Sequence, residues 1–333
     1  MQQQLKKAAF FGESTQIARV YKQGRREQVA AATELYPHIV TGADFVTHVS
    51  HLQDLEVIFS TWGMPPLTEG QIAQLPRLRA VFYAAGSVQG FARAFLERNV
   101  LVVSAWAANA VPVAEFTLAQ ILLAGKGYFA NTREYVSPES RSTAYLGPGN
   151  FGETVALLGC GQIGRAVIAL LQPFHLRVVV FDPFLTPDAA QEMGVVKVSL
   201  EEAFAQGMVV SNHLANLPET AGLLRGAHFA QMRLHATFIN TGRGQTVAEE
   251  EMCAVLNARP DLTALLDVTH PEPPAADSAL YALPNVQLTT HIAGSVGDEV
   301  VRMADYMLSE FRAWEQGEEL RYAVTREMLS TMA

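Results

Sequence analysis

Residues 155–171 read VALLGCGQIGRAVIALL. The four apolar residues at the start of this stretch predict a buried strand, and the apolar spacing after the glycines predicts a helix over Arg165–Leu171. Between them, Gly159, Gly161 and Gly164 follow the pattern G-x-G-x-x-G. That pattern is weak evidence alone, but it gains weight between a strand and a helix. The stretch therefore predicts the opening strand, turn and helix of a doubly wound parallel sheet.

This kind of turn gives each glycine a separate task. The first permits the tight turn, the second lets the backbone approach a pyrophosphate, and the third lets the helix pack on the strand. The N-terminus of the helix then offers amide donors and the positive end of its dipole to the phosphates. Asp182 ends the next predicted strand, where a carboxylate binds ribose hydroxyls and repels a 2′-phosphate. Because Pro183 and Phe184 supply no cation, we predict NAD rather than NADP.

Short apolar runs alternate with helical patterns on both sides of this turn, which is typical of strands buried on both faces of a parallel sheet. The predicted strands are 8–11, 38–40, 56–60, 79–83, 100–104, 155–158, 177–181, 195–198, 208–210, 237–239, 264–266 and 286–289. A helix is predicted over Val111–Leu123 with Pro112 in its first turn, and a last helix over Gly297–Trp314. Residues 131–150 are predicted to form a loop.

Composition argues against several classes of protein. A net charge of -9 is unsuited to a nucleic-acid surface, which needs clustered cations. The two cysteines, Cys160 and Cys253, have neither metal-ligand spacing nor a disulfide framework, so we expect no metal and a cytoplasmic location. Residues 1–7 lack the apolar core of a signal peptide. The apolar stretch Ala110–Gly125 is interrupted by a proline and a glutamate, and we expect it to be too short for a membrane span.

Polar side chains follow three predicted strands of the second half of the chain: Arg243, Glu272 and His291. Because the carboxyl ends of parallel strands share one edge of a sheet, the three side chains can converge there. Reduction of a 2-keto acid needs a cation for the carboxylate, an acid for the new alkoxide, and a group that holds this acid. His270 is a rival for His291, since it lies two residues from Glu272. We favour His291, because a strand end is a firmer position than a proline-rich loop.

The motifs around these residues, in this order after the glycine turn, resemble those of the D-isomer-specific 2-hydroxyacid dehydrogenase family. They are INTGRG (239–244), DVTHPEP (267–273) and TTHIAGS (289–295), and HLANLP (213–218) is a loose version of a fourth. From about Trp106 to the last predicted helix, the resemblance rests on these motifs. Over the first hundred residues it rests only on the alternation of predicted strands and helices.

The resemblance implies a role for each matching residue. Arg243 would bind the substrate carboxylate and carbonyl, which suits its bidentate guanidinium. His291 would exchange the proton, while Glu272 would hydrogen-bond the other imidazole nitrogen and favour the charged imidazole. Asp267 would meet the nicotinamide amide. The other implied contacts are Gln162 and Ile163 with the pyrophosphate, Thr241 and Gly294 with the cofactor, and the backbone of Ala85, Gly86, Ser87 and Val88 with the substrate carboxylate.

The predicted fold class is therefore α/β, with two doubly wound parallel-sheet domains. A Rossmann-type NAD domain, residues 109–293, would be inserted into a flavodoxin-like substrate domain made of residues 1–108 and 294–333. The resemblance also implies a homodimer formed through the cofactor domain, with the apolar helix and the following arm as its interface. We expect neither a nucleic-acid partner nor a membrane partner.

Three functions stay open from the sequence. The first is an NAD-dependent dehydrogenase of small D-2-hydroxy acids, or 2-keto acid reductase. The second is a formate- or phosphite-type dehydrogenase, although formate enzymes of this resemblance typically lack the glutamate found here at Glu272. The third is a non-catalytic binding protein that senses NADH. For the substrate, Ser60–Pro65 and Ala84–Gly90 contain no Lys or Arg, and with Trp62, Met64 and Tyr83 they predict an uncharged substituent.

Overall fold

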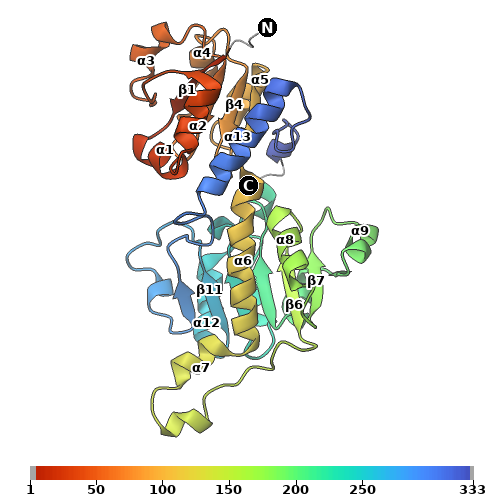
Figure 1. Ribbon diagram of the computed structural model, residues 1–333. Helices are drawn as coiled ribbons and strands as arrows, with labels where there is room; N and C mark the ends of the chain where they lie inside the picture. Colours follow the sequence, from red (N-terminus) through yellow and green to blue (C-terminus); the bar gives the residue numbers. More distant parts are fainter. Residues whose placement is uncertain (1–4, 331–333) are drawn as a thin grey trace. The chain divides into compact units, whose positions relative to one another are not determined.

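Two all-parallel sheets make up the fold of the computed structural model, which describes residues 5–330. Each sheet belongs to its own unit (Figure 1). Unit 1 consists of two segments, up to Asn109 and from Ser295 onward, and unit 2 is the continuous segment Ala110–Gly294. Residues 1–4, part of the stretch expected to lack a signal peptide, lie outside the described residues.

The sheet of unit 1 has the strand order β2-β1-β3-β4-β5. This is the doubly wound order of flavodoxin-like domains. Its strands are β1 (Lys6–Phe11), β2 (Thr33–Leu35), β3 (Val57–Ser60), β4 (Ala80–Tyr83) and β5 (Leu101–Ser104). Its helices are α1 (Ser14–Val20), α2 (Arg25–Ala32), α3 (Phe45–His48), α4 (Glu69–Ile72), α5 (Ala92–Glu97) and α13 (Val301–Gln316). The returning helix α13 packs on β4 and β5 and contacts α1 and α2 (Figure 1).

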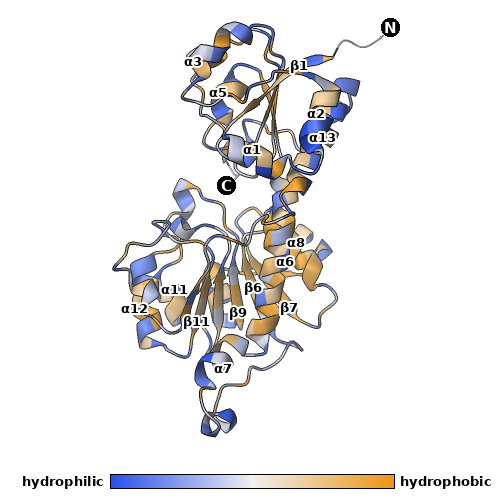
Figure 2. Ribbon diagram, turned by 60° about the vertical axis from the view of Figure 1, so that its left-hand side comes forward, coloured by the Kyte–Doolittle hydropathy of each residue, from blue (hydrophilic) through white to orange (hydrophobic). Residues whose placement is uncertain are grey.

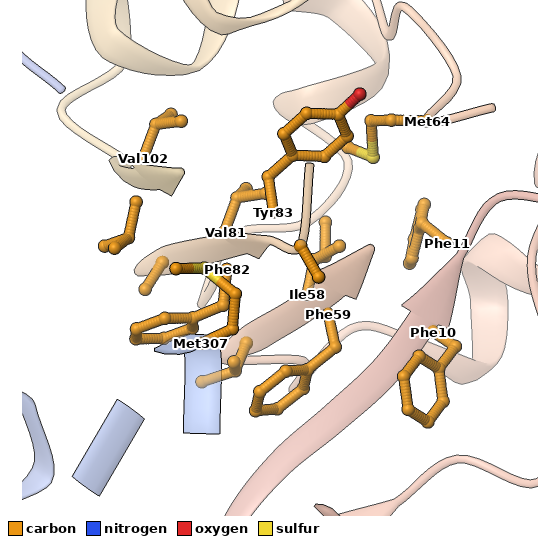
Figure 3. Close-up of a cluster of buried hydrophobic side chains, with 14 of the residues drawn as sticks. Phe10, Phe11, Ile58, Phe59, Met64, Val81, Phe82, Tyr83, Val102 and Met307 are labelled. Atoms are coloured by element: carbon orange, nitrogen blue, oxygen red, sulfur yellow. The ribbon is translucent and has the colours of Figure 1, made fainter. Parts of the chain in front are cut away.

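The core of unit 1 is rich in aromatic rings (Figure 3). Phe59 on β3 stacks on Phe82 of β4 with ring centroids 5.6 Å apart, and Phe311 of α13 lies edge-on at 5.2 Å from Phe59. Figure 3 also shows Met64 beside Tyr83 at the carboxyl ends of these strands, and both are buried. Burial of such rings is a major source of stability, and α13 contributes Phe311 to this core.

The sheet of unit 2 has the order β12-β11-β10-β9-β6-β7-β8. Six of these strands reproduce the Rossmann order 3-2-1-4-5-6, and β12 extends the sheet beyond β11. The strands are β6 (Thr154–Leu158), β7 (Arg177–Phe181), β8 (Val196–Lys197), β9 (Val209–Asn212), β10 (Thr237–Asn240), β11 (Thr263–Leu266) and β12 (Val286–Leu288). The topological switch point, where such sheets bind ligands, lies between β6 and β9.

Helices cover both faces of this sheet, and Figure 2 shows the strands between them as largely hydrophobic. Val155 and Leu157 of β6 share a core with α6 and α8, whereas Ala156 and Leu158 share one with α10, α11 and α12. The helices are α6 (Trp106–Gly125), α7 (Tyr128–Glu134), α8 (Gln162–Leu171), α9 (Pro187–Glu192), α10 (Leu200–Gln206), α11 (Gly226–Ala230) and α12 (Glu249–Ala258). The alternation along one strand explains why β6 is apolar throughout.

Helix α6 differs from its prediction in both its start and its length. It begins at Trp106, so Pro112 lies inside the helix rather than in its first turn. With 20 residues, α6 is long and apolar enough to span a bilayer by length and composition, so the expectation that this stretch is too short for a span was wrong. However, Ala114, Ile121 and Ala124 are buried in the core of unit 2. Packing of this kind explains how the helix tolerates the amide that Pro112 lacks.

Other elements also differ from the predicted bounds. The strand predicted at 38–40 is wrong, because the sheet uses β2 at Thr33–Leu35 and Val40 forms only an isolated bridge with Phe11. Pro37 lies between them and has no N–H for a continuous ladder. The predicted loop over 131–150 contains the end of α7 and a 3₁₀ turn at Glu139–Ser142. The last helix begins at Val301 rather than at Gly297, whose φ of 57° is left-handed.

Candidate active site

The turn between β6 and α8 has the backbone that its glycines suggest. Gly159 has a φ of 98°, and a Cβ there would lie 2.7 Å from the carbonyl oxygen of His213. A Cβ on Gly164 would overlap the carbonyl of Gly159, so this glycine lets α8 pack on the turn. By contrast, a Cβ on Gly161 would meet no atom of residues 5–330 within 4 Å. The chain therefore leaves space beside Gly161.

Asp182 ties this turn to the end of β7. Its Oδ2 accepts a hydrogen bond from the amide of Cys160 at 2.7 Å, and its Oδ1 accepts from the amides of Phe184 at 2.7 Å and Leu185 at 3.1 Å. A carboxylate has about four lone-pair sites, so acceptor capacity remains for a ribose hydroxyl. Burial raises the pKa of the Cys160 thiol, which argues against a nucleophilic cysteine in the turn.

These features fit a bound dinucleotide. Helix α8 begins at Gln162, three positions before its predicted start, so Gln162 and Ile163 lie in its first turn. The first amides of a helix have no intrahelical acceptor, and they attract anions together with the helix dipole. The space at Gly161 would admit a pyrophosphate against these amides, while Asp182 would face the ribose.

The second group of side chains lies at the ends of β10, β11 and β12. Nδ1 of His291 donates a hydrogen bond to Oε1 of Glu272 at 2.6 Å, and both side chains are about half exposed. Arg243 is largely buried, and its Nη1 donates to the carbonyl of Gly242 at 2.8 Å. Burial lowers the pKa of the Arg243 guanidinium, and the charge of Glu272 partly opposes this effect. The structure thus brings the three candidates together, with Glu272 close enough to act on both cations.

Arg243 and Glu272 lie near each other because the two loops that carry them approach closely. A Cβ on Gly244 would overlap the backbone of Thr269, so only a glycine after Arg243 lets its turn approach the loop that carries Glu272. The rival His270 is exposed, and its amide donates to Oε2 of Glu249 at 3.3 Å. The imidazole bonded to Glu272 is that of His291.

Asp267 holds the His291 turn. Its Oδ1 accepts from Oγ1 of Thr289 at 2.6 Å and from the amide of Ile292 at 2.8 Å, while Oδ2 accepts from the amide of Ala293 at 2.9 Å. His291 itself has a φ of 59°, a left-handed conformation that is uncommon without a glycine. Backbone strain of this kind persists where the surroundings fix it. Both oxygens of Asp267 therefore bind the chain, in addition to any contact with nicotinamide.

Thr241 and His213 belong to a buried chain of polar side chains. Oγ1 of Thr241 lies 3.1 Å from Oγ1 of Thr117 on α6 and 3.4 Å from Nδ1 of His213, and Nε2 of His213 lies 3.0 Å from Oγ of Ser211. Burial lowers the pKa of His213 to about 4. Because this imidazole is buried and bonded, His213 is a packing residue here. Gly294, the remaining cofactor candidate, is the last residue of unit 2.

The substrate-loop candidates lie in unit 1, directly after β4. Oγ of Ser104 lies 2.9 Å and 2.7 Å from the carbonyl oxygens of Ala85 and Gly86, which fixes the turn. The amide of Ala85 donates to the carbonyl of Tyr83 at 2.9 Å, so this amide is already used. Within residues 5–330, the amides of Gly86, Ser87 and Val88 have no hydrogen-bond acceptor. These three amides could bind a carboxylate.

Two of the three side chains offered for the substrate pocket are buried. Met64 and Tyr83 are buried in the core of unit 1 (Figure 3), and burial raises the pKa of Tyr83 to about 12. Trp62 is only partly buried, and the guanidinium of Arg19 from α1 lies 5.5 Å from the centroid of its ring. The prediction considered only the cations within the two loops. It missed Arg19, which lies on α1 outside these loops but contacts Trp62.

Sequence reasoning also missed a set of buried polar residues beneath the Arg243 turn, namely Asn212, Asn240 and Thr246. For Asn212 and Asn240 the available signal was an asparagine at the end of a buried strand, since a buried amide must find a hydrogen-bond partner.

The glycine turn, Asp182 and the strand order together define unit 2 as a Rossmann domain for NAD. A family model described as "D-isomer specific 2-hydroxyacid dehydrogenase, NAD binding domain" matches residues 118–293, more than half of the chain. The chain therefore belongs to the D-isomer-specific 2-hydroxyacid dehydrogenase family, and NAD is its cofactor.

Similar proteins agree with this assignment. The chain is 30% identical over 254 residues to D-3-phosphoglycerate dehydrogenase of Mycobacterium tuberculosis, covering 76% of this chain and 48% of that protein. It is 28% identical over 284 residues to the enzyme of the same name from Rattus norvegicus, covering 85% of this chain and 53% of that protein. The chain thus spans about half the length of the curated relatives it matches.

Solved structures share the fold over almost the whole chain. The TT0316 protein of Thermus thermophilus has a TM-score of 0.70 at 25% identity, covering 96% of this chain and 100% of that one. D-mandelate dehydrogenase of Rhodotorula graminis has a TM-score of 0.82 at 20% identity, covering 96% of this chain and 98% of that one.

Proposed function

We propose that the chain catalyses hydride transfer between NAD and C2 of a small D-2-hydroxy acid or the corresponding 2-keto acid. The observation that carries this proposal is the 2.6 Å hydrogen bond between His291 and Glu272, with Arg243 within electrostatic range of the same carboxylate. A cation, a proton donor and a carboxylate that orients this donor are the groups that ketone reduction requires.

In the proposed reaction, bound NADH supplies the hydride that adds to C2 of the keto acid. Arg243 would bind the substrate carboxylate and polarise the carbonyl. As the carbon–oxygen double bond becomes single, the oxygen would take a proton from Nε2 of His291. Glu272 would keep the imidazole oriented through Nδ1 and stabilise its charged form before this transfer. Oxidation of the hydroxy acid would reverse each step, with neutral His291 as the base.

Unit 1 is proposed to be the substrate domain, made of residues 1–108 and 294–333, and residues 109–293 the NAD domain. The amides of Gly86, Ser87 and Val88 would bind the substrate carboxylate from unit 1. In the NAD domain, the residues of the glycine turn would bind the pyrophosphate and Asp182 the ribose. Thr241, Asp267 and Gly294 would contact the nicotinamide end of the cofactor.

We propose that the substrate has an uncharged substituent, although the curated relatives named above are D-3-phosphoglycerate dehydrogenases. The loops at 60–65 and 84–90 carry no Lys or Arg. Arg19 of α1 lies over the face of Trp62 in the first of these loops, where the ring quadrupole attracts it.

The experiment is NADH oxidation measured with a panel of uncharged 2-keto acids, beside hydroxypyruvate and 3-phosphohydroxypyruvate. Turnover of any of these acids supports the dehydrogenase, and turnover of none overturns it in favour of an NADH-binding protein or a formate-type enzyme. Higher kcat/KM for hydroxypyruvate than for its phosphorylated form supports the uncharged substituent. A preference for the phosphorylated form that disappears in Arg19→Ala would show instead that Arg19 binds a second anion.

The proposed assembly is a homodimer in the cytoplasm. Leu123 on α6 and four side chains of the following arm are exposed although they are apolar: Tyr128, Tyr135, Val136 and Leu146. An exposed apolar patch of this kind usually marks an interface. Light scattering on the purified chain would test the dimer, and a monomer at micromolar concentration would overturn it.

Cell fractionation would test the proposed cytoplasmic location. Both cysteines are free thiols, as is usual in a reducing cytoplasm.

A further inference from the structure

Three buried polar side chains lie beneath the Arg243 turn. Asn212 ends β9, Asn240 ends β10, and Thr246 lies in the 3₁₀ turn Gly244–Thr246, and their exposed fractions are 0%, 1% and 0%. Nδ2 of Asn212 donates to Oδ1 of Asn240 at 3.0 Å and to Oγ1 of Thr246 at 2.8 Å. A buried amide that loses its partners destabilises a protein strongly, so these bonds constrain the positions of all three side chains.

The bonds converge on the backbone at Arg243. Its carbonyl oxygen accepts from Oγ1 of Thr246 at 2.8 Å and from Nδ2 of Asn240 at 3.3 Å. Oδ1 of Asn240 also accepts from the amide of Gly242 at 3.1 Å. The peptide group that follows the Arg243 Cα is therefore fixed, and so is the peptide group between Thr241 and Gly242, one residue earlier. These two anchors limit the direction in which the guanidinium leaves the backbone.

Asn212 also holds the end of β9. Its Oδ1 accepts from the amide of Leu214 at 3.2 Å. This amide and the carbonyl of His213 form the surface against which Gly159 packs, at 3.0 Å and 2.7 Å from a Cβ placed there. The side chain of Asn212 thus connects the backbone that faces Gly159 with the turn that carries Arg243.

We propose that Asn212 is a positioning residue, which orients Arg243 toward the substrate carboxylate through Asn240 and Thr246. The inference rests on the proposed function, in which Arg243 binds that carboxylate. Asn212 acts on Arg243 through its Nδ2, whereas its Oδ1 holds Leu214 beside the dinucleotide turn. Loss of the Nδ2 bonds alone should therefore affect the keto acid and leave the affinity for NADH nearly unchanged.

The test is Asn212→Asp, which keeps the size and one oxygen for Leu214 but removes both donated hydrogen bonds. Asn285→Asp is the matched control, because Asn285 is 1% exposed and its Nδ2 donates to the carbonyls of Leu256 at 3.0 Å and Arg259 at 3.2 Å. Both variants should lower the Tm. Only Asn212→Asp should lower kcat/KM for the keto acid by about tenfold or more, with the Kd for NADH within about twofold. Equal kinetic losses in the two variants would overturn the inference.

A second variant covers the case in which Asn212→Asp does not fold. Thr246→Val has the same shape without the hydroxyl that links Asn212 to the carbonyl of Arg243, and it should reproduce the kinetic loss. In an Arg243→Ala background, Thr246→Val and Asn212→Asp should have little further effect on kcat/KM, because the group they position is gone. Losses that simply add would show a general structural role.

Hydrogen exchange separates this inference from the proposed function. The amides of residues 242–247 should exchange faster in Asn212→Asp than in Asn285→Asp, and this readout needs no activity. Unchanged exchange would overturn the positioning role even in an active enzyme. A wild-type chain that reduces no 2-keto acid would instead overturn the proposed function, whatever the exchange result.

Discussion

Nδ1 of His291 donates a 2.6 Å hydrogen bond to Oε1 of Glu272 across a sequence separation of 19 residues. The bond occupies one nitrogen of the imidazole and leaves Nε2 for a substrate. Glu272 therefore fixes the orientation of the imidazole ring.

We expect Glu272→Gln to lower kcat for keto-acid reduction by about ten- to a hundredfold, since the variant loses the carboxylate that orients His291 through Nδ1. The Kd for NADH should not change. His291→Ala should remove most of kcat, whereas His270→Ala should retain it, because His270 is exposed and interacts with Glu249. If the two histidine variants gave the opposite result, the proton donor would be His270.

A pair of glycine variants tests the dinucleotide turn. Gly161→Ala should leave stability unchanged or raise it slightly, because its Cβ would enter open space, yet it should weaken NADH binding about tenfold or more by filling the pyrophosphate position. Gly164→Ala should instead lower the free energy of unfolding by about 1–3 kcal/mol, because its Cβ would overlap the carbonyl of Gly159. Isothermal titration and urea unfolding measure the two effects. Normal NADH binding by Gly161→Ala would contradict the assignment.

Cofactor choice depends on the charge of Asp182. Asp182→Asn keeps a carbonyl acceptor for part of the turn but removes the charge that repels a 2′-phosphate, so the ratio of kcat/KM for NADPH to that for NADH should rise about tenfold or more. Asp188→Asn on α9 removes an exposed charge nearby and should leave the ratio unchanged. A ratio that stays constant in Asp182→Asn would remove Asp182 from the ribose site.

The buried imidazole of His213 should make unit 2 less stable in acid. Its pKa falls from an ordinary 6.5 to about 4 in the folded chain, because burial disfavours the charged form. Above pH 6.5 neither state binds the proton; between pH 6.5 and about 4 only the unfolded chain does, so stability decreases as the pH falls. The loss should reach roughly 3 kcal/mol. Urea unfolding at several pH values should show this slope in wild type and in His175→Gln, an exposed control, but not in His213→Gln.

Much of the fold could be predicted from local patterns. The strands β1, β3 to β7 and β9 to β12 lie where apolar runs were found, because a strand covered on both faces must be apolar throughout. The start of α6 could not be predicted, since local rules place a proline in the first turn and only packing keeps Pro112 inside the helix. Nor could β2, because which of two short runs pairs with β1 depends on contacts distant in sequence.

Some residues of the candidate site could likewise be predicted from the sequence, and others could not. Arg243, Glu272 and His291 follow strands, so topology alone indicates that they can meet. Asp267 accepts from backbone amides of the His291 turn, and Asn212 donates to the buried side chains of Asn240 and Thr246. A sequence does not display which of these atoms a carboxylate or an amide group will reach. Met64 and Tyr83 are buried, and local sequence does not show whether an apolar residue beside a predicted pocket faces that pocket or the core.

The two-segment composition of unit 1 has a consequence for biosynthesis. Met303, Met307 and Phe311 of α13 are fully buried in its core, but they leave the ribosome only after all of unit 2. The first 109 residues must therefore wait with an apolar sheet face uncovered while the continuous unit 2 is made and folds. During that interval the nascent chain exposes a surface that chaperones bind. Translation that stops near residue 294 would yield a folded dinucleotide unit attached to an aggregation-prone half-domain.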